Sequence, residues 1–233
     1  MIPRRIVTTW ICDPARDGYN ERHREMLAQC LTSWLRLMPD YELEFVTMGN
    51  IRRFGTSEWL EARLAEGNFI AASQYARIVW LKWLGGVFVD ADVEAAQRFD
   101  SLLADEDVLT LGHLGNGQGF ANNAVMAAAA GHPALLEMER LLYRVPPTHA
   151  DYGNATGPVM VTHMLREQCW DGADREMRIG DVQVRRSAVF YPYNWNQGFT
   201  PECVQADTIA LHHWASSWKP REQQPHHVWR ERR

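Results

Sequence analysis

Two aspartates one residue apart, Asp90 and Asp92, are the residues of this sequence best suited to chemistry. They follow a short apolar run, 87–89, at the point where a strand is expected to end in a loop. Residues i and i+2 of an extended backbone point to the same side, so we expect the two carboxylates to lie close together. They would repel each other unless a cation or a shared proton lay between them. The spacing therefore predicts Mg²⁺ or Mn²⁺, held by carboxylates and by the phosphates of a ligand.

The same D-x-D pattern opens phosphatases of the phosphoaspartate type, which also place it after an apolar strand. Those enzymes usually have Gly and then Thr or Val after the second aspartate, whereas Val93 and Glu94 follow it here. The phosphatase reading is therefore disfavoured. If Asp92 binds a cation, replacing it with alanine is expected to leave stability near or above that of the unaltered chain, because carboxylate repulsion is removed.

Further polar residues are expected at the same edge of the sheet. Arg77 lies on the helix before the apolar run, where it can extend to the surface or reach a sugar hydroxyl or a phosphate. The pair His212 and His213 follows a strand near Ser217 and Trp218. Adjacent histidines are more often unliganded than metal-bound, but this pair follows a strand in a chain that needs a third ligand.

The elements that position these residues alternate between strands and helices. We predict the following strands: 6–11, 41–47, 87–89, 108–111, 120–126, 182–184, 188–191 and 208–212. We predict helices at 21–38, 57–66, 71–84, 133–142 and 156–169. Such alternation is typical of an α/β fold with a mostly parallel central sheet flanked by helices, in which sites form at the carboxyl ends of strands. Trp10 lies near such an end, where it serves either the core or a stacking site for a base.

Composition narrows the class of protein. The chain has 233 residues, a net charge of −5 with both signs interspersed, and no internal repeat or linker. We expect one domain, 1–219, followed by a polar, Arg-rich tail, 220–233, and no binding to nucleic acid. No apolar run is long enough to span a membrane, and 1–14 lacks the apolar stretch of a signal peptide. Four scattered cysteines predict buried free thiols in a reducing cytoplasm, with a disulfide pair or a metal site as the alternatives.

The segment 71–94, AASQYARIVWLKWLGGVFVDADVE, resembles the block A-x-x-S-D-x-x-R-x-x-x-L-x-x-x-G-G-x-Y-x-D-x-D of the retaining glycosyltransferases of family 32. This family contains the yeast initiating α-1,6-mannosyltransferase and bacterial capsular and lipopolysaccharide sugar transferases. The start, IPRRIVTTWI, resembles the family's I-P-K-x-I-H-x-x-W. NNAVMAAAAGHP, TGPVMVT and ALHHWASSWK resemble its later blocks, so the resemblance covers nearly the whole chain.

The resemblance implies a GT-A fold and a metal-dependent retaining glycosyltransferase. Such an enzyme moves a hexose from a UDP- or GDP-linked donor to a hydroxyl of a saccharide or glycolipid acceptor. It implies bacterial surface polysaccharide synthesis, of capsule or lipopolysaccharide, in the cytoplasm. Peripheral contact of the Arg-rich tail with the inner face of the membrane is left open. Retaining enzymes of this type lack a secure carboxylate nucleophile, so a front-face mechanism is expected.

The resemblance also implies roles for individual residues. Asp92 would bind Mn²⁺ or Mg²⁺ directly, and Asp90 would contact the metal or the ribose. His212 would be a ligand of the metal or the diphosphate, with His213 as the alternate.

Other residues would bind the donor. Trp10 would stack on the nucleotide base, Arg77 and Asn123 would address the donor sugar, and Ser217 and Trp218 would close over the diphosphate.

The sequence departs from the family pattern at two positions. Gln74 stands where the family has an aspartate that grips donor-sugar hydroxyls, and Thr8 stands where it has a histidine. Glutamine keeps a carbonyl acceptor and adds donors but loses the charge. We expect Gln74 to change the donor preference or to weaken the activity. The alternative is a non-catalytic homologue that binds a sugar nucleotide.

Overall fold

A computed structural model describes residues 1–11, 21–145 and 155–215. Ser217, Trp218 and the tail 220–233, to which roles or membrane contact were assigned above, lie outside these residues. Those assignments stay predictions. No helix in the described part of the chain is both long and apolar enough to cross a membrane.

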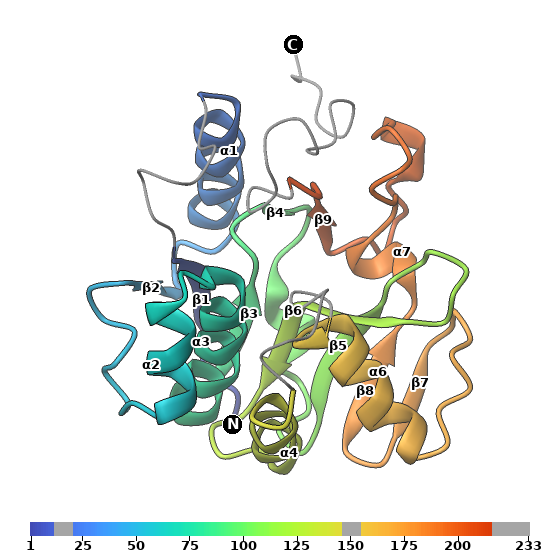
Figure 1. Ribbon diagram of the computed structural model, residues 1–233. Helices are drawn as coiled ribbons and strands as arrows, with labels where there is room; N and C mark the ends of the chain where they lie inside the picture. The colour runs from blue at the N-terminus through green and yellow to red at the C-terminus, as the bar shows by residue number, and fades with distance from the viewer. Residues whose placement is uncertain (12–20, 146–154, 216–233) are drawn as a thin grey trace.

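The chain folds into a seven-stranded mixed sheet with helices on both faces (Figure 1). Its strands are β1 (Arg5–Trp10), β2 (Glu42–Thr47), β3 (Gly86–Val89), β5 (Leu109–His113), β6 (Ala121–Ala128), β7 (Met177–Ile179) and β8 (Val182–Arg185). A separate two-stranded sheet contains β4 (Val93–Ala95) and β9 (Ala210–His212). The helices are α1 (Glu21–Leu37), α2 (Glu58–Ala65), α3 (Phe69–Leu84), α4 (Pro133–Leu142), α6 (Pro158–Glu167) and α7 (Ser187–Phe190), with 3-10 helices at Phe99–Leu103 and Pro201–Cys203.

The order of strands in the large sheet is β2-β1-β3-β6-β5-β8-β7. β1 runs parallel to both β2 and β3, and β5 runs parallel to β8, whereas β6 and β7 are antiparallel to their neighbours. Most strands of this sheet therefore point the same way. The predicted α/β architecture with a mostly parallel sheet is confirmed, and the site edge lies where β1 and β3 end.

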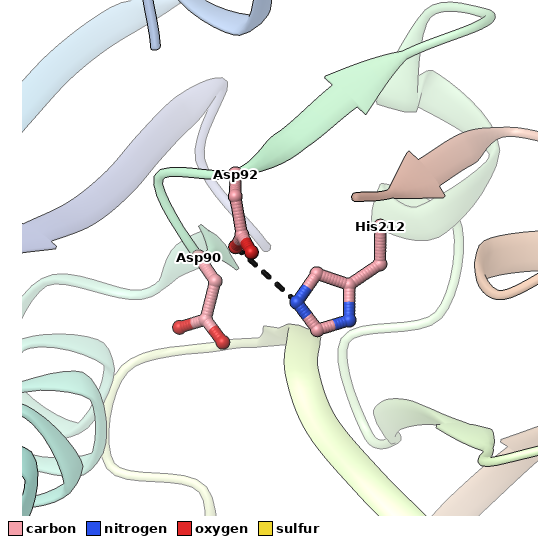
Figure 2. A group of neighbouring side chains, drawn as sticks. All are labelled: Asp90, Asp92 and His212. Atoms are coloured by element: carbon pink, nitrogen blue, oxygen red, sulfur yellow. Dashed lines mark ion pairs between the residues drawn. The ribbon is translucent and has the colours of Figure 1, made fainter. Parts of the chain in front are cut away.

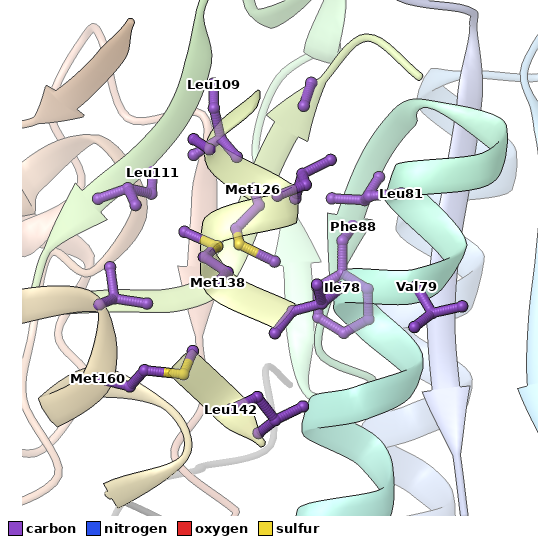
Figure 3. Close-up of a cluster of buried hydrophobic side chains, with 14 of the residues drawn as sticks. Ile78, Val79, Leu81, Phe88, Leu109, Leu111, Met126, Met138, Leu142 and Met160 are labelled. Carbon is purple, nitrogen blue, oxygen red and sulfur yellow. The ribbon is translucent and has the colours of Figure 1, made fainter. Parts of the chain in front are cut away.

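Alternate side chains of the central strands enter two cores. Val7 and Phe88 face the core beneath α3, α4 and α6, which Figure 3 shows. Ile6 and Val87 belong to the second core, which includes the apolar face of α1. A strand buried on both faces reads as a continuous apolar run, which is why 87–89 carries no polar residue.

The turn between α3 and β3 requires glycine. Gly85 has φ +64° and Gly86 has φ +115°, and a Cβ on Gly86 would lie 2.7 Å from the carbonyl oxygen of Arg5. Any larger residue would push β3 away from β1. The close approach lets α3, capped by Asn68, lie directly on the sheet. The sequence thus fixes the position of β3, whose end leads to the aspartates.

Two predicted strands differ from the structure. Residues 187–190 form the short helix α7, because a run of buried apolar residues without alternation suits either conformation. The last strand is shorter than predicted and pairs outside the large sheet, with β4, which was not predicted. Three-residue strands such as β4 and β7 carry too little pattern to be detected. Cys30, Cys169 and Cys203 are free as predicted, but only Cys30 is buried, since Cys169 is exposed and Cys203 is partly exposed.

Candidate active site

Asp90 and Asp92 lie close together because of a turn. The amide of Val93 donates to the carbonyl oxygen of Asp90 at 3.0 Å, so 90–93 closes a tight turn after β3. Before the turn, the amide of Asp90 donates to Ala124 of β6 at 2.8 Å. The expected proximity of the two carboxylates is correct, but the extended geometry from which it was predicted is not.

His212 completes a cluster with the two aspartates (Figure 2). The register of the small sheet places it opposite Val93, and its Nε2 lies 3.2 Å from Asp92 Oδ1. One ligand atom from each of the three residues lies within 4.8 Å of the others. His213 belongs to a different group of contacts, so His212 is the histidine that faces the carboxylates.

One oxygen of each carboxylate is already held by a protein donor. Arg77 donates to Asp90 Oδ1 at 2.7 Å, and the amide of Ala215 donates to Asp92 Oδ2 at 2.8 Å. These donors fix the orientation of both carboxylates. The second oxygen of Asp92 faces His212, and the second oxygen of Asp90 remains for the space that the cluster encloses.

Arg77 is the centre of a buried polar network. Its guanidinium is only 5% exposed, lies 4.7 Å over the ring of Phe88, and donates to Asn123 Oδ1 at 3.0 Å and to the Asn123 carbonyl at 2.9 Å. The Asn123 amide donates in turn to Gln74 Oε1 at 2.9 Å. The structure therefore brings Gln74, Asn123 and Arg77 together behind Asp90. The contacts of Arg77 are with the protein, so it orients Asp90.

The charges of the cluster shift the protonation of its members. Burial raises the pKa of Asp90, and Asp92 adds to this while Arg77 opposes it. Burial also disfavours the ionised form of Asp92, but the charge and hydrogen bond of His212 and the amide of Ala215 bring its pKa below the ordinary value. Burial lowers the pKa of His212, yet Asp92 and Asp90 raise it more, so the net pKa is above the ordinary value. The pairing with Asp92 thus favours the protonated form of His212.

Trp10 ends β1 and is partly exposed, beside the end of β3. Thr8 is buried, and its hydroxyl has no hydrogen-bond partner in the structure. The structure thus joins Gln74, Asn123, Arg77 and Asp90, and places His212 against Asp92, whereas the stacking role of Trp10 stays a prediction.

A second buried group supports the cluster and was not predicted. His213 Nε2 lies 3.0 Å from Glu94 Oε2, and its Nδ1 lies 2.8 Å from the hydroxyl of Tyr193. Gln29 of α1 also donates to Glu94, at 2.9 Å. These contacts join α1, β4 and β9 directly behind Asp92. No local sequence pattern predicts these contacts, because Glu94 and His213 lie far apart in the chain.

Tyr193→Phe tests this support. Glu94 only accepts, so His213 Nε2 donates to it, and the variant leaves the buried Nδ1 unpaired. We expect a loss of about 1–3 kcal/mol in the free energy of unfolding, measured by urea denaturation. Tyr143→Phe, whose hydroxyl donates to Glu139 at a half-exposed site, is the matched control and should cost less than about 0.5 kcal/mol. Equal losses in the two variants would contradict the supporting role.

Aromatic rings line the other side of His212. The Trp214 ring centroid lies 4.1 Å from that of His212, and Tyr191 lies 5.8 Å from it. Trp214 has φ +52°, which is unusual for a bulky residue, and its indole N–H donates to the Tyr193 carbonyl at 2.8 Å. The constrained backbone holds the ring against His212. Trp214 was not predicted for the site, and the feature of the sequence that could have indicated it is its position directly after the histidine pair.

The donor set fits a divalent cation. Two carboxylates and one imidazole with atoms within 4.8 Å suit Mn²⁺, and carboxylates also suit Mg²⁺. His212 Nδ1 is buried and has no hydrogen-bond partner in the structure. The pairing of Nε2 with Asp92 is therefore the contact that orients the ring. Because the pairing with Asp92 favours the protonated imidazole, a cation at this site would compete with that proton.

Cation binding is therefore expected to depend on pH. The raised pKa of His212 stabilises the metal-free fold below the ordinary imidazole value of about 6.5, and this contribution disappears as the pH rises through the raised value. The affinity of the site for Mn²⁺ rises over the same pH interval, because His212 loses the proton that competes with the cation. In EDTA, the difference in melting temperature between the unaltered chain and His212→Gln should fall from pH 6 to pH 9. The rise in melting temperature that Mn²⁺ causes in the unaltered chain should instead grow over this range. A Mn²⁺ effect that does not change with pH would contradict the proton exchange.

Comparison with known proteins agrees with this geometry. Residues 24–109 match the family described as "Glycosyltransferase sugar-binding region containing DXD motif". This range includes Gln74, Arg77 and both aspartates. No curated protein is significantly similar to the sequence.

Solved structures share the fold. The structure described as "PaToxG Glycosyltransferase" has a TM-score of 0.53 at 14% identity, over 71% of this chain and 69% of that chain. The ligand-free glycosyltransferase domain from the YGT toxin has a TM-score of 0.53 at 9% identity, over 79% of this chain and 80% of that chain. These likenesses show the fold, which is of the GT-A type, and the family match shows the DXD region within it.

Proposed function

We propose that this chain, a glycosyltransferase with a DXD sugar-binding region in a GT-A fold, transfers a hexose from a UDP- or GDP-linked donor with retention of configuration. The observation that carries the proposal is the cluster of Asp90, Asp92 and His212 at the edge where β1 and β3 end. Open α/β sheets bind nucleotides at such an edge. The family match excludes neither nucleotide, so both are retained.

We propose that Asp92, His212 and the free oxygen of Asp90 hold Mn²⁺ or Mg²⁺. The imidazole favours Mn²⁺ over Mg²⁺, which prefers oxygen ligands. When bound, the cation stabilises the negative charge that develops on the departing nucleoside diphosphate.

The neighbouring residues orient the donor. Arg77 holds Asp90 in place, and the Asn123 amide holds the side chain of Gln74. The contacts of Arg77, Asn123 and Gln74 with the donor sugar are proposed from the sequence resemblance. Trp10, partly exposed at the end of β1, offers a ring for the nucleotide base. Ser217 and Trp218 are proposed to close over the diphosphate.

We propose that no side chain of the protein forms a covalent bond with the donor sugar. Asp90 and Asp92 are both fixed by hydrogen bonds, so neither is proposed as a nucleophile. The chain positions an acceptor hydroxyl against the anomeric carbon and excludes water. The departing phosphate then accepts the proton of that hydroxyl on the same face. A saccharide or glycolipid acceptor in bacterial surface polysaccharide synthesis is proposed from the sequence resemblance.

A thermal-shift screen tests the proposal. UDP- and GDP-sugars are added with Mn²⁺ or with EDTA, and any donor that raises the melting temperature is then tested for slow hydrolysis. We expect at least one nucleotide sugar to stabilise the chain in Mn²⁺ only and to be hydrolysed. If no nucleotide sugar stabilises the chain or is turned over, the proposed function is wrong.

A further inference from the structure

We propose that Trp195 is a stacking platform for a pyranose ring of the acceptor. The residue is 41% exposed and lies in the segment that connects α7 to the 3-10 helix at Pro201–Cys203 (Figure 1). No role in the transfer reaction was assigned to it above. That the bound saccharide is the acceptor rests on the proposed function. That a saccharide binds here is argued from the following contacts.

Trp195 is joined to the candidate cation site through one intermediate ring. Its centroid lies 5.9 Å from that of Trp214 with the planes at 73°, and Trp214 lies 4.1 Å from His212. The rings therefore form a continuous row from the cluster outward. Exposure rises along the row, from 8% for His212 to 9% for Trp214 and 41% for Trp195.

The inner ring holds the outer one in place. Trp214 is nearly buried and is anchored by its bond to the Tyr193 carbonyl. Trp195 meets this fixed ring edge to face, which is a favourable arrangement for two aromatic side chains. A large apolar ring that is held rigidly and still exposed loses little conformational freedom on binding.

Amide side chains lie in the same segment as Trp195 and in the loop that this segment contacts. Asn194, next to Trp195, donates to the carbonyl of Gly115 at 2.7 Å, which ties the segment to the loop between β5 and β6. That loop carries Asn116 and Gln118, and Gln197 follows Trp195. Amides donate and accept, as sugar hydroxyls do, and they carry no charge.

A neutral saccharide matches this combination. The C–H groups on one face of a pyranose pack on an aromatic ring, while its hydroxyls pair with amides. A nucleotide would instead need cationic groups for its phosphates, and the described residues named here provide none. The position beside the cation site, on the side of β9 and opposite β1 with Trp10, suits the acceptor.

The test uses the full chain and needs no turnover. Methyl glycosides of glucose, galactose, mannose and N-acetylglucosamine are titrated separately into ¹⁵N-labelled protein with UDP and Mn²⁺ present. The indole N–H of Trp195, assigned by Trp195→Phe, reports binding. We expect at least one glycoside to shift this signal. Both variants lack this indole, so their binding is followed by the indole N–H of Trp214, whose ring contacts that of Trp195. Trp195→Ala should weaken binding about tenfold, and Trp195→Phe should retain most of it.

Trp83→Ala is the matched control. Trp83 is 56% exposed and stacks on Phe54, but it ends α3 at the opposite end of β3 from the aspartates. Its removal should leave glycoside affinity unchanged.

Three results would overturn the proposal: no glycoside shifts the Trp195 signal, UDP alone shifts it as much as a glycoside does, or Trp195→Ala binds the glycoside normally. Failure of the transferase reaction shows separately, as the absence of nucleotide-sugar hydrolysis.

Discussion

Asp92→Asn is expected to reduce donor turnover by about 10²- to 10³-fold, because it removes the negative charge that pairs with the cation. The variant keeps the size of the side chain and one oxygen that can accept from the Ala215 amide. Initial rates of nucleotide-sugar hydrolysis in Mn²⁺ measure the effect. Asp207→Asn alters an exposed carboxylate paired with Arg186, and should leave the rate unchanged. Full activity of Asp92→Asn would contradict the role of this carboxylate.

The structure also changes the expected effect of Asp92 on stability. Removal of a repelling carboxylate was expected to leave stability near or above that of the unaltered chain. Asp92 is instead paired with His212 and bonded to the Ala215 amide. Asp92→Ala leaves both groups without their partner, so we expect a loss of about 1–3 kcal/mol in the free energy of unfolding.

Arg77→Met is expected to lower the free energy of unfolding by about 3–5 kcal/mol. It leaves the buried carboxylate of Asp90 without its cationic partner and Asn123 without its donor. The pKa of Asp90, which burial already raises, should rise further. At neutral pH, the variant should therefore lose donor turnover as well as stability.

Two further variants separate charge from packing. Arg77→Met combined with Asp90→Asn should recover part of the lost stability, because the carboxylate that lost its cationic partner is removed, but it should not recover turnover. Arg52→Met breaks an exposed pair with Glu61 and should cost less than about 1 kcal/mol. Urea denaturation of the four proteins gives the comparison. If Arg77→Met and Arg52→Met cost the same, Arg77 does not compensate a buried charge.

The segment 71–94 could be predicted closely because each signal in it is local. Helical spacing ends at Gly85, the apolar run is buried on both faces, and the aspartates follow at the strand end. Local signals failed where tertiary pairing decides the conformation. Residues 188–191 have an apolar run that suits a strand, but residues 187–190 form the helix α7.

The candidate site was predictable in its residue types but not in its support. Asp92 and His212 were chosen as residues that a cation needs, and the β4–β9 register brings them to 3.2 Å. The pair of His213 with Glu94 depends on that same register, which no periodicity encodes. Gln74 was singled out as a departure from a pattern, and its contact with Asn123 shows how an uncharged residue fits beside Arg77.

A Mn²⁺ titration followed by electron paramagnetic resonance tests the central claim most directly, because the signal of free Mn²⁺ disappears on binding. The chain with UDP should bind one Mn²⁺ through Asp90, Asp92 and His212. Asp92→Asn should lose this binding, whereas Asp207→Asn should keep it. Urea denaturation of Asp92→Asn establishes that this variant is folded. Equal Mn²⁺ binding by the unaltered chain and Asp92→Asn would contradict a cation site at this cluster.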